Sequence, residues 1–154
     1  MKKQTIALVA HDNRKKDLIE WVEFNKASLL KHSLVCTGTT GRMVEAALTQ
    51  NRSKSEPKPE ITLLKSGPLG GDQQLGALIC EGKVDLLIFL WDPMQPQPHD
   101  VDVKALLRIS SLYNIPTATN RSTADFIISS TLFGTDYHPQ VKSFSEYLGR
   151  TVEI

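Results

Sequence analysis

The chain of 154 residues is long enough for one domain with a substantial hydrophobic core. Its 18 lysines and arginines balance 17 aspartates and glutamates, and this formal net charge of +1 argues against nucleic acid or a membrane surface as the main partner. The apolar runs are too short to span a bilayer, and no apolar block after Lys2 and Lys3 is typical of a signal peptide. We therefore expect a soluble, cytoplasmic protein with a single domain over 1–154, made of a core over about 5–130 and a tail over 131–154.

The first predicted element is a strand over 5–10, a nearly continuous apolar run of the kind buried on both faces of a sheet. A helix is expected over 15–24, where apolar residues recur at helical spacing. His11, Asp12 and Lys15 lie between the strand end and the first helical turn. They form either a helix cap beside a solvated lysine or part of a site, because a lysine in the first turn opposes the helix dipole unless an anion binds there.

A second strand is predicted over 34–36 and ends in the turn Thr37-Gly38-Thr39-Thr40-Gly41, with a helix expected over 42–49. Three hydroxyls and two glycines before a helix N-terminus favour a small phosphate over a plain threonine-rich turn. The turn matches neither a Walker A loop nor the G-x-G-x-x-G fingerprint. The polar stretch over 50–60 contains two prolines and predicts an exposed loop rather than a domain linker, distant from the strand ends that would carry the chemistry.

A third strand over 61–64 leads into a glycine-rich turn over 65–74 and a helix over 75–80. Three glycines allow the backbone to turn tightly and a ligand to approach closely, and the main-chain N–H groups there suit an anion. Asp72 would repel such an anion. The simpler interpretation is that Asp72 is an N-cap, but polar residues at the other strand ends favour a role in a site.

The run over 84–90 is the clearest buried strand. A proline-rich loop follows it and leads to a helix expected over 103–112, with Asp100 as the N-cap. His99 and Asp102 are three residues apart and would share one face of this segment. A capped helix with an incidental histidine is the alternative.

The last strand is predicted over 115–119 and the last regular helix over 123–130. The alternation of strands and helices predicts an α/β fold, a doubly wound five-stranded parallel sheet in three α/β/α layers. The tail after residue 130 has weak apolar periodicity and is expected to form a short helix or an interface segment. Cys36 and Cys80 match no metal-binding or redox spacing, so we expect both to be buried, reduced and structural.

In such sheets ligands bind beyond the carboxyl ends of the strands, where polar residues of this chain gather. One site is expected to collect His11, Asp12, Lys15, Thr37, Thr39, Thr40, Ser66, Asp72, Asp92, His99 and Asp102. A carboxylate and an imidazole beside a phosphate pocket suit proton abstraction next to a carbonyl, with stabilisation of an enediolate. A phosphate ester held in the enediolate plane would give isomerisation, and one held perpendicular to it would give elimination; the spacing leaves both open.

These motifs resemble those of the methylglyoxal synthases. The similar segments are residues 6–12, 37–41, 66–74, 89–93, 98–108 and 116–128. The resemblance implies a carbon–oxygen lyase that converts dihydroxyacetone phosphate to methylglyoxal and inorganic phosphate without a metal or organic cofactor. It also implies a homohexamer that phosphate inhibits cooperatively, with an arginine near the C-terminus linking subunits; Arg150 is the one arginine in the tail.

The same resemblance implies a role for each site residue. Asp72 would be the base, His99 would contact the carbonyl and hydroxyl oxygens and move a proton between them, and His11 would line the substrate site. Asp102 would complete the catalytic group as a carboxylate that tunes it, with Asp12 and Asp92 as further supporting carboxylates. Phosphate would be bound by Lys15, Thr37, Gly38, Thr39, Thr40, Ser66 and Gly67.

Two other functions stay open from the sequence. Regulatory domains of carbamoyl phosphate synthetase resemble this pattern and bind small phosphorylated or nucleotide effectors without chemistry. They would need the threonine turn but not Asp72, His99 and Asp102 together, so the presence of all three favours an enzyme. An isomerase acting on the same triose phosphate would need the same base and a different phosphate geometry.

Overall fold

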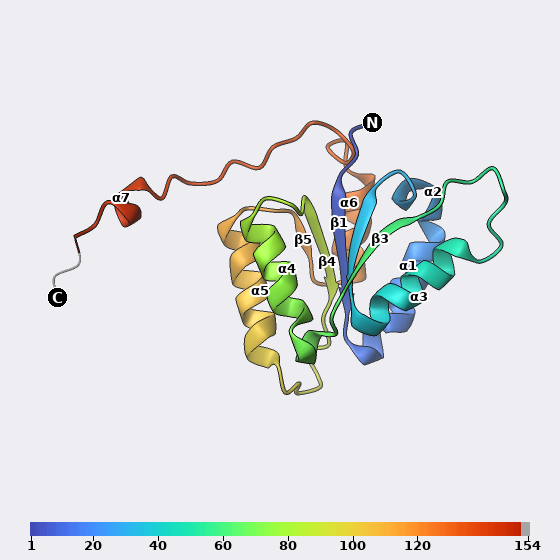
Figure 1. Ribbon diagram of the computed structural model, residues 1–154, viewed down its shortest axis with the longest axis horizontal. Coiled ribbons are helices and arrows are strands. Elements are labelled where there is room, and N and C mark those ends of the chain that lie inside the picture. The colour runs from blue at the N-terminus through green and yellow to red at the C-terminus, as the bar shows by residue number, and fades with distance from the viewer. Residues whose placement is uncertain (152–154) are drawn as a thin grey trace.

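The computed structural model describes residues 1–151 and contains one all-parallel sheet of five strands in the order β3-β2-β1-β4-β5 (Figure 1). The strands are β1 (Thr5–Ala10), β2 (Ser33–Thr37), β3 (Glu60–Leu64), β4 (Leu86–Leu90) and β5 (Thr117–Ala118). The helices are α1 (Lys15–Phe24), α2 (Lys26–Leu29), α3 (Gly38–Thr49), α4 (Gly71–Cys80), α5 (Asp100–Leu112), α6 (Arg121–Ser129) and α7 (Ser145–Leu148). Two short 3-10 turns, η1 (Asp12–Arg14) and η2 (Gly67–Leu69), lie beside the ends of β1 and β3.

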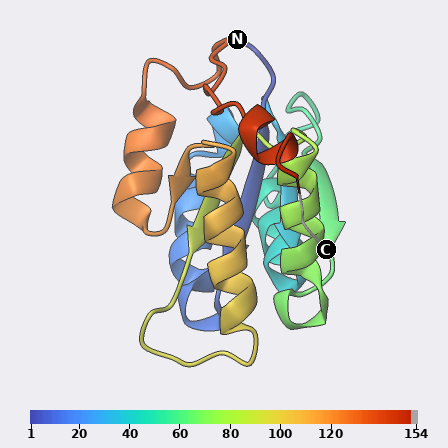
Figure 2. The ribbon, with the colours of Figure 1, turned by 90° about the vertical axis from the view of Figure 1, so that its left-hand side faces the viewer.

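Helices cover both faces of the sheet, which confirms the predicted three-layer, doubly wound fold. Helices α1, α3 and α6 lie on one face and α4 and α5 on the other (Figures 1 and 2). Each face has its own hydrophobic cluster, because alternate residues of the central strands point to opposite sides. In β1, for example, Ile6 and Leu8 pack towards the first layer, and Ala7 and Val9 towards the second.

The central strands β1, β2 and β4 are the most deeply buried, whereas β3 forms an edge. All five residues of β4 are buried, as expected for a parallel strand between two helical layers. Strand β3 alternates between half-buried and exposed positions, and the side chain of Leu63 is 47% exposed. Strand β3 is thus less buried than the central strands, because an edge strand has a neighbouring strand on one side only.

Several helices begin earlier than their apolar pattern predicts. Helix α3 begins at Gly38 rather than at residue 42, so the threonine turn is its first helical turn. Asp100 is the first residue of α5 and not its N-cap, which is His99; the Asp100 carboxylate accepts a hydrogen bond from the Gln97 main-chain N–H at 3.1 Å. The first turn of α3 lines a polar cavity, and that of α5 carries Asp100, Asp102 and the exposed Val101, so neither turn shows the apolar periodicity that marks a helix.

The remaining predictions concern a loop, two cysteines and the tail. Residues 50–59 join the end of α3 to the start of β3, at the end of the sheet opposite to the carboxyl ends of the strands, as predicted for the exposed loop. Cys36 is buried and burial raises the pKa of its thiol to about 12, but Cys80 is exposed, because it ends α4 on the solvent side, and its predicted burial is wrong. The tail contains the four-residue helix α7 and runs away from the sheet (Figure 1). Within residues 1–151, no helix has the length and apolar character needed to cross a membrane.

Candidate active site

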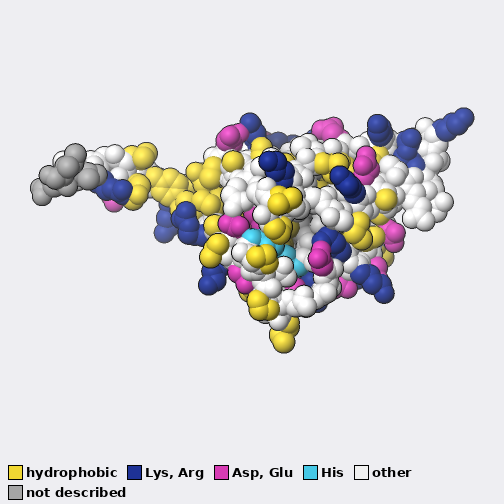
Figure 3. Space-filling model, turned by 60° about the horizontal axis from the view of Figure 1, so that its bottom comes forward, with side chains coloured by type: hydrophobic (Ala, Val, Ile, Leu, Met, Phe, Trp, Pro, Cys, Tyr) yellow, Lys and Arg dark blue, Asp and Glu magenta, His cyan; other side chains and the backbone are white. Residues whose placement is uncertain are grey.

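A cavity of about 250 Å³ lies at the carboxyl ends of β1, β2 and β3 and at the start of α5. This is the place where the strand order reverses, with β2 and β3 on one side of β1 and β4 and β5 on the other. The space-filling view turned towards this end shows histidine side chains in a recess among acidic and basic groups (Figure 3). The cavity is lined by Val9, Ala10, His11, Asp12, Lys15, Thr37, Gly38, Thr39, Thr40, Ser66, Gly67, Pro68, Asp72, Gln97 and His99.

One half of the cavity has the properties of an anion site. The N-terminus of α3 lies there: the N–H of its first residue, Gly38, donates to the Lys65 carbonyl, and the N–H groups that follow it in the first turn have no partner within the helix. Hydroxyl groups of Thr37, Thr39 and Ser66 line the same region. Lys15, at the start of α1, supplies a positive charge and forms an ion pair with the exposed carboxylate of Asp12. This pair holds the pKa of Asp12 below its usual range.

Gly38 is required by the close approach of α3 to the turn after β3. Its φ is +39°, a conformation that residues with a side chain rarely adopt. A Cβ at this position would lie 2.6 Å from the Cα of Ser66, and the Gly38 N–H donates to the Lys65 carbonyl at 3.1 Å. The missing side chain therefore lets the Ser66 hydroxyl and the first turn of α3 line one cavity.

The other half of the cavity contains an acid–base pair. The Oδ2 atom of Asp72, in the first turn of α4, lies 3.7 Å from Nε2 of His99, the N-cap of α5. Both side chains are almost fully buried. Within residues 1–151 no hydrogen-bond partner meets Asp72 Oδ2, His99 Nδ1 or His11 Nε2. Buried polar atoms are rarely left without partners, so three of them in one cavity indicate a site built to meet polar atoms of a ligand.

Burial raises the pKa of the Asp72 carboxyl above its usual range, because the charged form loses its hydration. A charge on His99 opposes this shift, and the carboxylate of Asp102 adds to it. A raised pKa makes the Asp72 carboxylate a stronger base than an exposed aspartate, which suits the removal of a proton from carbon. Helix α4 is not capped by Asp72, since its N-cap is Gly70, and the interpretation of Asp72 as an N-cap is wrong.

Comparison with known proteins agrees with this geometry. The MGS-like domain family matches residues 17–119. The methylglyoxal synthase of Maridesulfovibrio salexigens is 56% identical over 97% of this chain and 98% of its own length, and that of Pseudoalteromonas atlantica is 57% identical over 84% and 90%. The chain belongs to the methylglyoxal synthase family. A crystal structure of methylglyoxal synthase from Elizabethkingia anophelis NUHP1 has the same fold, with a TM-score of 0.87 and 45% identity over 98% of this chain and 93% of that one.

Two of the residues that the resemblance to methylglyoxal synthases placed in the site lie outside the cavity lining. Asp92 is buried behind His11, to which its main-chain N–H donates a hydrogen bond at 3.2 Å. Asp102 lies in the first turn of α5, where its charge reaches Asp72. The supporting role expected for Asp92 and the place of Asp102 in the catalytic group stay predictions.

Gln97 and Pro68 also line the cavity, together with an apolar wall formed by Val9 and Ala10, and none of these four was predicted as a site residue. Gln97 lies between two prolines in a loop, and nothing in its surroundings in the sequence distinguishes it from an exposed loop residue. Pro68 lies within the glycine-rich turn over 65–74, so its neighbours are the only signal that the sequence offers for it. The roles of the predicted site residues stay predictions.

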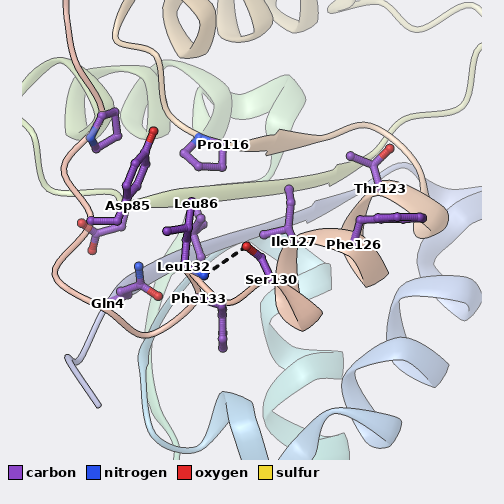
Figure 4. A pocket seen from close by; sticks show the side chains of 12 residues that line it. Gln4, Asp85, Leu86, Pro116, Thr123, Phe126, Ile127, Ser130, Leu132 and Phe133 are labelled. Carbon is purple, nitrogen blue, oxygen red and sulfur yellow. Dashed lines mark hydrogen bonds between the residues drawn. The ribbon is translucent and has the colours of Figure 1, made fainter.

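A second cavity, of about 310 Å³, lies at the opposite end of the sheet, near the amino ends of β1, β4 and β5 and between α6 and the start of the tail (Figure 4). Its lining is mostly apolar, with Leu86, Ile127 and Phe133 among its members. The carboxylate of Asp85 already accepts a hydrogen bond from the Thr5 main-chain N–H. This lining therefore offers no acid–base pair comparable to Asp72 and His99. Within residues 1–151 no three histidine, cysteine, aspartate or glutamate side chains gather as a metal site.

Proposed function

We propose that the chain is a methylglyoxal synthase, a carbon–oxygen lyase that converts dihydroxyacetone phosphate to methylglyoxal and inorganic phosphate. The observation that carries this proposal is the pairing of Asp72 and His99 at 3.7 Å inside the cavity that also holds the anion site. The cavity has a volume of about 250 Å³, below the range of about 300–1,000 Å³ that is usual for larger ligands. A cavity of this size suits a small ligand such as a three-carbon phosphate ester.

In the proposed reaction the Asp72 carboxylate removes a proton from the carbon that bears the substrate hydroxyl. The electron pair of that C–H bond forms an enediolate, whose oxygens are met by N–H donors in the cavity. His99 contacts the carbonyl and hydroxyl oxygens and moves a proton between them. The C–O bond to phosphate then breaks, the phosphate leaves with the electron pair, and the remaining enol takes up a proton at the terminal carbon to give methylglyoxal.

Elimination requires the bond to phosphate to stand perpendicular to the enediolate plane, because only then does its antibonding orbital overlap the π system. The anion site lies on the walls formed by α1 and α3, whereas Asp72 and His99 come from α4 and α5 on the other side of the sheet. A substrate that spans the two has its phosphate held apart from its reacting carbon. This arrangement supports a fixed phosphate orientation, and the identity of the product is the test.

The first prediction concerns the base. Replacing the carboxylate in Asp72→Asn removes the proton acceptor while keeping the side-chain size, so we expect kcat to fall by about 10²–10⁴-fold, the usual contribution of a general base. Inorganic phosphate binding, measured by calorimetry, should change little. In the wild-type protein, kcat/KM should fall as the pH is lowered through the pKa of Asp72, and this acid limb should lie above the pKa of an ordinary aspartate because burial raises it.

Asp85→Asn is the matched control, since Asp85 lies just before β4, at the end of the sheet opposite to the cavity, and accepts a hydrogen bond from the Thr5 N–H. Its kinetics should equal those of the wild type. Dihydroxyacetone phosphate is assayed for methylglyoxal and for glyceraldehyde 3-phosphate together. Formation of the aldehyde phosphate alone would indicate an isomerase, and phosphate binding without either product would indicate an effector-binding module. An Asp72→Asn protein with normal turnover would rule out the proposed base.

The proposed partners are dihydroxyacetone phosphate as substrate and inorganic phosphate as product and cooperative inhibitor, in a homohexamer. Arg150 is proposed to contact another subunit. Its guanidinium stacks on the Tyr147 ring at 3.5 Å and donates a hydrogen bond to the Tyr147 hydroxyl. The tail that carries Arg150 leaves the domain at the end of the sheet opposite to the cavity (Figure 1). An effect of Arg150 on catalysis would therefore be exerted on the cavity of a neighbouring copy.

A further inference from the structure

His11 has a fixed arrangement of its two ring nitrogens. Its Nδ1 atom accepts a hydrogen bond from the main-chain N–H of Asp92 at 3.2 Å. A main-chain N–H can only donate, so Nδ1 carries no proton in this arrangement, and the proton of the neutral ring is on Nε2. Turning the ring over would place a C–H group against the same amide. The Asp92 amide therefore selects the Nε2–H form of neutral His11.

The Nε2 atom of His11 is buried, and no partner meets it within residues 1–151, although the residue lines the cavity. Two aromatic rings hold the imidazole in place at nearly right angles. The ring centroid of Phe89 is 5.2 Å away, and that of His99 is 5.7 Å away. A donor that is buried, oriented and without a protein partner is suited to meet an oxygen of the ligand.

The Asp92 carboxylate is held by other donors and does not bond to the imidazole. Its Oδ2 atom accepts from Nδ2 of Asn13 at 3.0 Å, and its Oδ1 atom accepts from the Met94 main-chain N–H at 3.0 Å. A carboxylate that was free to reach Nδ1 of His11 would instead stabilise a proton there and favour the cationic ring. The Asn13 amide and the Met94 N–H together fix the Asp92 carboxylate in a position where it does not bond to the imidazole.

We propose that Asn13 is a positioning residue of this site: by holding the Asp92 carboxylate, it keeps His11 neutral with an Nε2–H that donates to an enediolate oxygen. The inference rests on the proposed function, because the enediolate is its intermediate. A neutral imidazole donor stabilises a developing oxyanion without giving up its proton, whereas a cation would protonate the intermediate and an Nδ1–H form would present no donor.

The charged surroundings of His11 agree with a neutral ring. Burial is the largest cause that lowers the pKa of His11, and His99 lowers it further. Asp92 and Asp100 raise this pKa, and Lys15 lowers it. The net direction is down, so the ring stays neutral as the pH falls to values at which an exposed histidine is already charged.

The test is nitrogen NMR of the histidine rings in the free protein, with His11 assigned by comparison with His11→Gln. We expect the wild type to show an unprotonated Nδ1 and a protonated Nε2 from about pH 8 down to about pH 6. In Asn13→Ala, the Nδ1–H form or the cation should gain population. The kcat should fall by about three- to tenfold with little change in KM, the size expected when one oriented hydrogen bond is weakened.

Asn13→Gln keeps an amide donor and should recover part of kcat. Asn25→Ala is the matched control, because Asn25 at the other end of α1 donates to the Trp21 carbonyl and is distant from the cavity. A wild-type His11 protonated at Nδ1, or charged at about pH 7, would overturn the inference. So would an Asn13→Ala protein with unchanged ring nitrogens and kcat. A wild type that forms no methylglyoxal would overturn the proposed function instead, whatever the ring spectrum shows.

Discussion

Gly67 controls how closely the acid–base pair approaches the turn after β3. A Cβ built on Gly67 would lie 3.0 Å from His99 Nε2 and 3.1 Å from Asp72 Oδ2. That position is between the two groups that the substrate must reach. We therefore predict a steric role for Gly67 beside its predicted phosphate contact, and the sequence, which showed only a glycine next to a proline, could not distinguish the two.

We expect Gly67→Ala to lower kcat/KM by at least about 10²-fold, because a displacement of about 1 Å in a catalytic group has an effect of that size. Far-UV circular dichroism and the urea midpoint should stay close to those of the wild type, since the methyl group enters a cavity. Gly76→Ala is the control. No atom lies within 4 Å of a Cβ at Gly76 in α4, so this variant should keep full activity and gain up to about 1 kcal/mol of unfolding free energy. An active Gly67→Ala enzyme would contradict the steric role.

At the scale of whole elements, the periodicity of apolar residues predicts the bodies of the helices better than the residues at which they begin. The apolar spacing in α1 predicted its bounds of Lys15–Phe24 as they occur. Helices α3, α4 and α5 begin earlier than predicted, because their first turns carry polar residues, glycines or an exposed valine instead of apolar side chains for the core; those of α3 and α4 also line the cavity. Strand β5 is shorter than the predicted 115–119, since only Thr117 and Ala118 pair with β4.

Helix α6 provides a prediction that separates stability from catalysis. The Asn120 side chain accepts from the Thr123 main-chain N–H at 2.9 Å and so caps the helix. We expect Asn120→Ala to lower the unfolding free energy by about 1 kcal/mol, measured by urea denaturation, with kcat unchanged. Asn120→Asp keeps an oxygen acceptor and should unfold like the wild type. Equal stability of all three proteins would show that the cap contributes nothing.

At the scale of the whole molecule, the strand order explains where the site lies, but it gives no role to the tail after residue 130. Beyond Gln140, whose carbonyl accepts from Asn114, the hydrogen bonds described up to residue 151 lie within the tail itself. Yet the tail carries exposed apolar side chains, with Tyr147 62% and Leu148 80% exposed. Such an arm is costly in water unless another surface covers it.

If the proposed homohexamer uses this arm, ending the chain after Gln140 should reduce the mass measured by light scattering while the far-UV spectrum and cooperative unfolding persist. The reason is that no described hydrogen bond joins residues 141–151 to the sheet or its helices. Ser53→Ala, in the exposed loop over 50–59, is the control variant, and its mass by light scattering should equal that of the wild type. A truncated protein with the mass of the full chain would exclude the arm as an assembly element.

The sequence by itself determined the alternation of strands and helices and the residue types at the strand ends, because these depend on local apolar spacing and on glycine and proline chemistry. It also carried the family resemblance, through motifs such as residues 66–74. Only the tertiary structure decided which polar groups share one cavity. The 3.7 Å approach of Asp72 to His99 joins residues 27 positions apart, and the hydrogen bond from the Asp92 amide to His11 joins residues 81 positions apart. The position of Asp102 outside the cavity lining likewise depends on how the helices pack. Distances of that kind follow from packing and strand order, which no local pattern encodes.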